Sequence, residues 1–364
     1  MAGVRSLTGS DIEQVAELHN LVFLPSRPMT SQLRQRYRHW LETVYLKNQA
    51  RLAGYDPLVY EHDGSIVGFL GVAGRRFTIR GQTYTGTLHS NFAVHPAHRG
   101  RGVGGALFRA YLELPRDFAF VDEVGERNRP LHERLGMTVS PAQSLRWIMP
   151  LRPMRRLAAL VTDKILPKML RPVGLLPADA MDAVLRHIPR SPYKFKLPDL
   201  QVTPLSGSGL ASLIAGFQGE DLLRPDTSDG GIEWLVERAK SMHEHGHGQL
   251  VLNSLHAKGA LVGWYVYYAN KGGPSEVLQL VAADREWAAP VVDSLAHDAW
   301  SRGASSLCGV LHPDLVAPLA ARRAVFDPWV RWMLVRTENP VILDAFIRGR
   351  SLLSRLDGEW CHHA

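Results

Sequence analysis

The chain has 364 residues, of which 45% are hydrophobic and 21% charged, and this composition indicates a soluble globular protein long enough for two domains. It has no apolar run of about 20 residues that could span a bilayer, no apolar secretion signal and only two cysteines, Cys308 and Cys361, so we expect a cytoplasmic protein without a disulfide framework. The net charge of +7 favours an anionic ligand, a nucleic acid or an acidic membrane surface without choosing among them.

The first half of the chain reads mainly as strands with helices between them. A short strand begins at Val4, and a Gly-Ser turn joins it to a helix. Residues 58–94 read as three strands joined by tight turns. The next elements are a helix over 106–114, a strand over 117–124, a helix over 128–136 and a strand over 144–151. We therefore predict an α/β (α+β) fold with a mixed, mainly antiparallel sheet flanked by helices.

Segments of the first half recur in the second half in the same order. The pairs are 4–23 with 202–217, 64–72 with 259–267, and 145–151 with 330–335. This order predicts a duplicated fold, with domains at 1–150 and 199–364 joined by a linker at 151–198. The linker region is basic and rich in proline, with apolar residues near helical spacing. We favour a connecting helix packed on both domains over a basic amphipathic surface for peripheral membrane contact or an acidic partner.

The stretch "NFAVHPAHRGRGVGGALF" (91–108) places four glycines between a predicted strand and a predicted helix. Gly100, Gly102 and Gly105 formally match a dinucleotide-binding fingerprint, and Asp122 lies at a suitable distance. In that fold, however, the first glycine closes the strand itself, whereas here the strand ends at Val94. A nucleotide P-loop is excluded because no Lys-Ser/Thr pair follows the glycines.

The pattern Arg99-x-x-Gly102-x-Gly104 is the better description of this turn. Amides at a helix N-terminus point outward unsatisfied, and the helix dipole adds positive potential. Glycines let phosphate oxygens approach these amides without a Cβ in the way. Because Arg99 and Arg101 add positive charge, the pattern predicts a pyrophosphate site.

At this turn the sequence resembles the GNAT acyltransferases, which bind acetyl-coenzyme A. The resemblance depends on 91–108 and on "NRPLHERLGM" (128–137), and it covers the first 150 residues. It implies that the strand end binds the pantetheine arm, that the turn holds the pyrophosphate, and that Asn128 contacts the coenzyme arm. The implied coenzyme residues are Phe92, Ala93, Val94, Arg99, Gly100, Arg101, Gly102, Val103, Gly104, Gly105 and Asn128.

The resemblance also suggests catalytic candidates. The family has a tyrosine where this chain has His132, and we take His132 as the general acid for the departing thiolate. For the general base we consider His89, Ser90 and Asn91 on the coenzyme strand, or Asp122 and Glu123 on the next strand. Strand alternation puts His89 and Asn91 on one face and Ser90 on the other. The alternative for His89 is a histidine that only packs in the strand.

The matching turn of the second half, "ADREWAAP" (283–290), has no Arg-x-x-Gly-x-Gly pattern, and Glu286 would repel a phosphate. We therefore predict a degenerate GNAT-like half that shapes the acceptor site or stabilises the first domain. The histidines at 243, 245 and 247 lack an acidic or cysteine partner, so we expect no metal.

The sequence thus favours an N-acyltransferase that uses acetyl-CoA, or another acyl-CoA, to acylate an amine of a small molecule or peptide. One alternative is a non-catalytic acyl-CoA sensor or scaffold. Another is an acyltransferase of cell-envelope or polysaccharide biosynthesis whose basic linker touches the membrane. We expect no nucleic-acid partner, because basic and aromatic residues are not interleaved. The sequence leaves the acceptor, the acyl chain length and the oligomeric state open.

Overall fold

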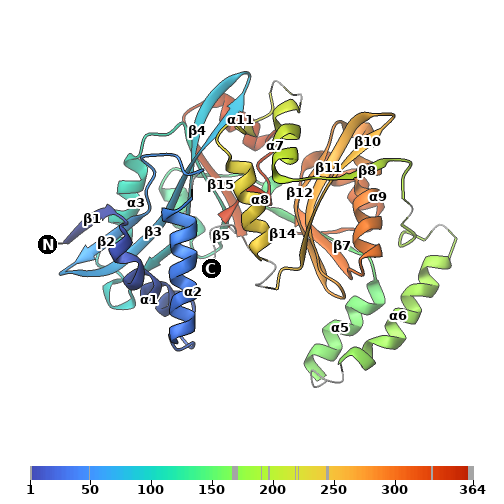
Figure 1. Cartoon of the computed structure of the whole chain (residues 1–364), viewed down its shortest axis with the longest axis horizontal. Helices are drawn as coiled ribbons and strands as arrows, with labels where there is room; N and C mark the ends of the chain where they lie inside the picture. Colours follow the sequence, from blue (N-terminus) through green and yellow to red (C-terminus); the bar gives the residue numbers. More distant parts are fainter. Residues whose placement is uncertain are drawn as a thin grey trace.

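The computed structural model contains two mixed, mainly antiparallel sheets with helices packed around them, one in each half of the molecule (Figure 1). The α/β (α+β) fold expected from the sequence is confirmed. The structure describes residues 2–48, 50–165, 171–189, 191–195, 197–217, 219, 221–242, 246–328 and 331–359. His243 and His245 of the histidine run lie outside these residues.

The first sheet has the strand order β1-β2-β3-β4-β5-β15-β6, and β9 pairs with β3 beside this path. Its main members pair antiparallel, except that β4 and β5 run parallel. The strands are β1 (Ala2–Ser6), β2 (Leu58–His62), β3 (Ser65–Ile79), β4 (Gln82–Val94), β5 (Phe118–Gly125), β6 (Thr138–Val139), β9 (Arg224–Pro225) and β15 (Arg331–Thr337).

The second sheet has the order β14-β7-β13-β12-β11-β10-β8. Here β12 and β13 form the parallel pair, which corresponds to β4 and β5 of the first sheet. The strands are β7 (Leu145–Pro150), β8 (Gln201–Pro204), β10 (Gln249–Ala257), β11 (Ala260–Ala269), β12 (Pro274–Ala282), β13 (Ser306–Val310) and β14 (Val325–Pro328).

The helices bury apolar stripes against these sheets. In α3, Val103, Leu107 and Tyr111 recur every four residues and are buried on the first sheet. The α-helices are α1 (Ile12–Phe23), α2 (Ser31–Leu41), α3 (Val103–Glu113), α4 (Arg129–Arg134), α5 (Pro153–Ile165), α6 (Arg171–His187), α7 (Gly207–Gly216), α8 (Gly231–Ser241), α9 (Arg285–Ser301), α10 (Val316–Ala321) and α11 (Pro340–Ile347).

The two halves exchange a strand. β7, which comes from the first half of the chain, lies between β13 and β14 of the second sheet. β15, from the second half, lies between β5 and β6 of the first sheet. Both are buried in the sheet they join: Trp147 of β7 is 1% exposed and Leu334 of β15 is fully buried. The sheets therefore do not divide the chain at residue 150, and each half needs the other for a complete core.

The linker forms a helical hairpin of α5 and α6 that projects from the second half, away from the first sheet (Figure 1). Asp182 of α6 accepts from the backbone amides of Met154 and Arg155 at the start of α5, both at 2.9 Å. Arg186 lies over the ring of Trp300 in α9, 3.6 Å from its centroid. The hairpin thus packs on the second half rather than between both domains. The membrane contact of this segment stays a prediction, and among the described residues no helix is long and apolar enough to cross a membrane.

Candidate functional site

The glycine turn joins β4 to the N-terminus of α3. Gly100 and Gly102 have φ angles of 75° and 84°, in the left-handed region that side chains disfavour. Gly102 is the N-cap of α3 and provides no side-chain cap. A Cβ on Gly104 would lie 2.8 Å from the ring of Phe92. Two positions are therefore glycine because of backbone conformation, and one because of close packing.

The first turn of α3 presents open backbone amides. Ala106 N–H donates to the Gly102 carbonyl at 2.9 Å. The amides before it, those of Val103, Gly104 and Gly105, precede the first intrahelical bond and point out of the helix end. Arg99 and Arg101 are exposed beside them. This combination of amides, helix dipole and arginines suits a phosphate group.

β4 and its parallel neighbour β5 separate before the turn. β4 and β5 pair from Gly86 opposite Phe118 to Leu88 opposite Phe120. Beyond Leu88, β4 continues to Val94 with β3 on its other side. A cavity of about 460 Å³ lies along this divergence, and Phe92, which packs against Gly104, is part of its wall. The turn and the cavity are therefore adjacent.

Two histidines lie together in the cavity wall. His89 of β4 and His132 of α4 stack with ring centroids 5.1 Å apart and an interplanar angle of 13°. Their Nε2 atoms are 3.0 Å apart. His132 Nδ1 lies 2.9 Å from the Asn128 carbonyl oxygen. Since a carbonyl oxygen only accepts, His132 carries its proton on Nδ1 and leaves a lone pair on Nε2.

These contacts determine which ring nitrogens of His89 and His132 carry a proton. With a lone pair on His132 Nε2, the proton between the rings belongs to His89 Nε2. His89 Nδ1 is then bare, and it has no hydrogen-bond partner among the described residues. Burial lowers the pKa of His132 and lowers the pKa of His89 well below its usual value. Both rings are therefore uncharged at neutral pH, and the pair can take up one proton.

The side chains of Ser90 and Asn91 contact Tyr45 and His19, on the opposite face of the strand from the His89 ring. Asn91 Nδ2 donates to the Tyr45 hydroxyl at 2.8 Å, and the same hydroxyl lies 3.0 Å from Ser90 Oγ. Asn91 Oδ1 is 3.3 Å from His19 Nε2 of α1. The expected alternation is wrong here, because Asn91 has φ of 53° at an irregularity in the β3–β4 register. Ser90 and Asn91 consequently share one network, while His89 faces α3 and α4.

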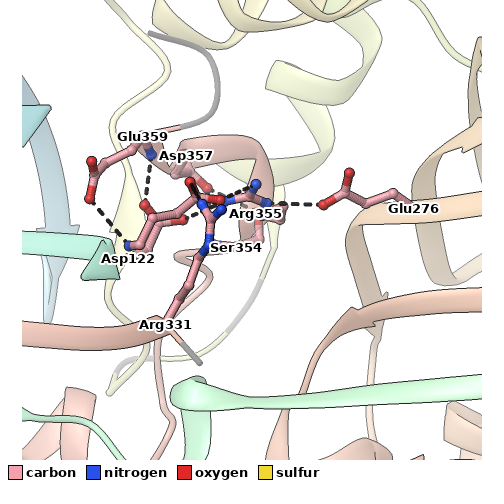
Figure 2. Close-up of polar contacts among 8 residues, drawn as sticks. Asp122, Glu276, Arg331, Ser354, Arg355, Asp357 and Glu359 are labelled. Carbon is pink, nitrogen blue, oxygen red and sulfur yellow. Dashed lines mark hydrogen bonds and ion pairs between the residues drawn. The ribbon is translucent and has the colours of Figure 1, made fainter. Parts of the chain in front are cut away.

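A segment near the end of the described chain reaches the same cavity. Glu359 lines the cavity and is 8% exposed. Its backbone amide donates to Asp122 Oδ1 at 2.7 Å, and its Oε1 accepts from the backbone amide of Glu123 at 3.2 Å (Figure 2). A Cβ on Gly358 would lie 1.9 Å from a carboxylate oxygen of Asp122. The segment is therefore held close against β5.

Arg355 anchors this segment between the two sheets. Its guanidinium lies 3.3 Å from Asp122 Oδ2 and 3.1 Å from Glu276 Oε1, and it also pairs with Glu123 (Figure 2). Asp122 and Glu123 belong to β5, whereas Glu276 belongs to β12. Arg331 of β15 pairs with Glu123 as well. The acidic part of the site is thus assembled from segments that are distant in the sequence.

The acidic groups hold protons more tightly than free carboxyls do. Burial raises the pKa of Asp122 to about 6. Burial also raises the pKa of Glu359 well above its usual value, and the neighbouring carboxylates of Asp122 and Glu123 raise it further. A carboxyl with a raised pKa, Glu359, and two imidazoles with lowered pKa values therefore face one cavity, an arrangement that is common where protons are transferred.

The sequence matches the acetyltransferase (GNAT) domain family over residues 3–117. The chain carries a GNAT domain. No curated protein sequence matches the chain, but many solved structures share its fold. A probable N-acyltransferase of unknown function from Enterococcus faecalis V583 has 12% identity and a TM-score of 0.58, over 94% of this chain and 74% of that one. A GCN5-related N-acetyltransferase from Kribbella flavida has 14% identity and a TM-score of 0.52, over 93% and 71%.

N-myristoyltransferase of Saccharomyces cerevisiae, solved with myristoyl-CoA and inhibitors, is also similar, with 11% identity and a TM-score of 0.51 over 97% of this chain and 86% of that one. At such identities the likeness shows the fold. The family match ends at residue 117, whereas the structural matches cover both halves. The second half therefore shares the architecture of these acyltransferases beyond the GNAT domain itself.

The first half of the chain gathers most of the residues expected from the sequence. His89, Ser90, Asn91, Phe92, Asn128 and His132 all line the cavity. Ala93 is buried in the core cluster that contains residues of α1 and α2, and Val94 is the last residue of β4 before the turn. Of the acidic candidates, Glu123 lines the cavity, whereas Asp122 holds the segment that carries Glu359. Glu359, Arg355 and Arg331 were missed because no local motif marks them.

In the second half, side chains of the chain itself occupy part of the corresponding slot, next to a cavity of about 400 Å³ lined by Leu280, Asp284 and Leu352. β12 and β13 pair from Pro274 opposite Ser306 to Val277 opposite Gly309 and then separate, as β4 and β5 do. Leu352 and Leu356 pack there in a core cluster with Leu278. Ser354 Oγ accepts from Gln279 Nε2 at 3.3 Å. A coenzyme arm would have to displace these side chains.

The helix after β12 is also closed to phosphate. Asp284 is the N-cap of α9, and its Oδ1 accepts from the amides of Glu286 at 2.9 Å and Trp287 at 3.2 Å. A carboxylate thus occupies the place where α3 presents open amides. The expectation that the second half does not bind a coenzyme at this turn stays a prediction.

Proposed function

We propose that the protein is an acyl-CoA-dependent N-acyltransferase that acylates a primary amine of a small molecule or peptide, with acetyl-CoA as the first acyl donor to test. The observation that carries the proposal is the open N-terminus of α3, next to a cavity whose wall contains ionisable side chains. The GNAT family match over residues 3–117 supports it.

The coenzyme would bind along β4. The amides of Val103, Gly104 and Gly105 would hold the diphosphate, with Arg99 and Arg101 adding charge. The backbone edge of β4 beyond Leu88, from which β5 has separated, would bind the pantetheine arm. The thioester would then lie in the cavity beside the histidine pair.

The histidine pair is suited to move one proton. The amine nitrogen attacks the thioester carbonyl carbon, forming the C–N bond, and the carbonyl oxygen gains the negative charge. The nitrogen passes a proton to the neutral pair of His89 and His132, and the C–S bond breaks. The pair returns that proton to the departing thiolate. These groups favour an enzyme over a passive acyl-CoA sensor, which needs no proton relay.

Calorimetric titration with acetyl-CoA tests the coenzyme site. We expect wild-type protein to bind, and Gly102→Asp/Gly104→Asp to lose affinity by about 100-fold or more, because carboxylates replace the open amides. Gly104→Ala should lose less affinity for acetyl-CoA, because its methyl group adds no charge and would only displace the ring of Phe92. Gly3→Asp is the matched control, since a Cβ there meets no atom within 4 Å.

Equal thermal midpoints for the variants would show that the fold is retained. No binding by the wild-type protein, or equal affinity in wild type and Gly102→Asp/Gly104→Asp, would contradict the proposed site. Amine-dependent release of free thiol from acetyl-CoA then separates an enzyme from a sensor.

A further inference from the structure

We propose that Glu359, which the second half inserts into the cavity of the GNAT domain, accepts the proton of the acceptor ammonium, and that Arg355 is its positioning residue. This inference rests on the proposed function. Glu359 is separated from Glu123, whose amide it contacts, by 236 positions in the sequence. The second half would thus supply a group for the reaction that the GNAT domain does not contain.

The path of the segment explains why Glu359 is well placed. Leu352 and Leu356 are buried in the core of the second half. The turn from Ser354 to Asp357 is held by the Asp357 carboxylate, which accepts from the Ser354 amide at 3.2 Å and from Arg75 at 3.0 Å. From this anchored turn the chain crosses to β5. Packing and hydrogen bonds of the preceding turn therefore limit where Glu359 can lie.

The crossing depends on Gly358 and Asp122. The Cβ of any other residue at 358 would lie 1.9 Å from a carboxylate oxygen of Asp122. Asp122 also accepts from the Glu359 amide at 2.7 Å. With Oε1 of Glu359 on the Glu123 amide at 3.2 Å, both the backbone and the side chain of Glu359 are oriented by β5 (Figure 2).

Arg355 compensates the charge of the carboxylates behind Glu359. It contacts Asp122, Glu123 and Glu276 and is only 13% exposed. Arg355 acts on Glu359 at longer range, but no ion pair joins Glu359 to another of the described residues, so its carboxylate can bind a cation from the cavity. Charged and titratable groups approach it from several elements: Asp122 and Glu123 of β5, Arg331 of β15, His89 of β4, His132 of α4, and Arg355 and Asp357 of its own segment.

An alkylammonium acceptor would satisfy this acidic end of the cavity. Burial and the neighbouring carboxylates raise the pKa of Glu359, so it holds a proton below that pKa and is a carboxylate above it. Binding of a cation favours the carboxylate form. Glu359 then takes one N–H proton of the ammonium, which leaves a neutral amine with a lone pair for attack and a protonated Glu359 that later returns its proton to solvent.

The test uses full-length protein, acetyl-CoA and two kinds of nucleophile. Tryptamine, spermidine and a lysine peptide are protonated at neutral pH, whereas hydroxylamine is largely unprotonated and needs no base. We expect Glu359→Gln to bind acetyl-CoA as wild type does and to lose about 100-fold or more in kcat with the alkylamines. With hydroxylamine it should keep the wild-type rate.

The pH profile provides a second readout. In wild type, kcat/KM should rise as pH increases through the raised pKa of Glu359, because the base is active only when deprotonated. This rising limb of the kcat/KM profile should be absent in Glu359→Gln. Glu237→Gln, an exposed carboxylate on α8, is the matched control and should retain both rate and limb.

Arg355→Lys tests the positioning role, because lysine keeps the charge and lacks the forked donors. We expect a lower kcat with alkylamines, an unchanged KM for acetyl-CoA and a normal rate with hydroxylamine. Equal losses with both nucleophiles would contradict positioning. An alkylamine rate in Glu359→Gln equal to wild type would overturn the inference while leaving acetyl-CoA binding intact. Wild-type protein that binds acetyl-CoA and transfers to no amine would contradict the proposed function as well.

Discussion

The N-termini of α3 and α9 occupy corresponding places in the two halves and differ in what their amides contact. In the first half, Gly102 caps the helix without a side chain, and the amides of the first turn remain open. In the second half, Asp284 occupies two of those amides. The parallel strand pair before each helix diverges in both halves, and in the second Leu352 and Leu356 fill part of the gap beside a cavity of about 400 Å³.

This comparison teaches how one architecture can leave a helix end open in one half and close it with a side-chain cap in the other. The packing of Leu352 and Leu356 and the cap by Asp284 stabilise the second half, and the Asp284 carboxylate disfavours a phosphate at α9. The first half keeps its amides and its cavity open. The segment that packs in the second slot then continues into the first cavity, so the second half also determines the shape of that cavity.

The largest effect should come from separating the halves. The fragment 1–150 lacks β15, so Phe118 and Phe120 lose the cover of Met333 and Val335. It also exposes Trp147, which belongs to the second sheet. We expect this fragment to show no cooperative unfolding by circular dichroism, whereas the full chain does. A fragment 1–150 that melts cooperatively and binds acetyl-CoA would show that the strand exchange is dispensable.

The filled slot should contribute more to stability than the surface of the linker does. Leu352 is 5% exposed in the core of the second half, so we expect Leu352→Ala to lower the free energy of unfolding by about 2–5 kcal/mol. Leu176→Ala is the control, because Leu176 is 64% exposed and should change little. Urea titration compares the two, and equal effects would argue against a packed slot.

The helix caps should give the smallest effect. Asp284→Ala should lower the free energy of unfolding by about 1 kcal/mol, as for other N-caps. Ser206→Ala, at the cap of α7, should cost a similar amount. Neither variant should gain an acetyl-CoA site, because Leu352 and Leu356 still occupy part of the slot before α9. A second binding event in calorimetry of Asp284→Ala would mean that the cap alone closes this half.

The glycine turn could be predicted from the sequence because its backbone conformation and packing constrain the residues locally. Left-handed φ angles at Gly100 and Gly102, and the close approach of Phe92 to Gly104, leave glycine as the residue that fits. The histidine pair was partly predictable, since His132 was placed by the motif and His89 by its strand. Their contact at 3.0 Å follows only from the tertiary structure.

The strand exchange and the acidic end of the cavity could not be predicted in the same way. β7 and β15 have similar apolar patterns, and such a pattern does not say which sheet a strand joins. The position of Asn91 was misjudged because a non-glycine residue with φ of 53° interrupts the alternation. Glu359 meets Glu123 only because Arg355 and Gly358 bring together segments that are far apart in the chain.

A crystal structure of the full-length protein with coenzyme A tests the central claim most directly. We predict one coenzyme per chain, with its diphosphate on the amides of Val103, Gly104 and Gly105 and its thiol in the cavity beside His132. A diphosphate bound at Asp284 and α9, or a coenzyme that leaves the turn after β4 empty, would contradict the account.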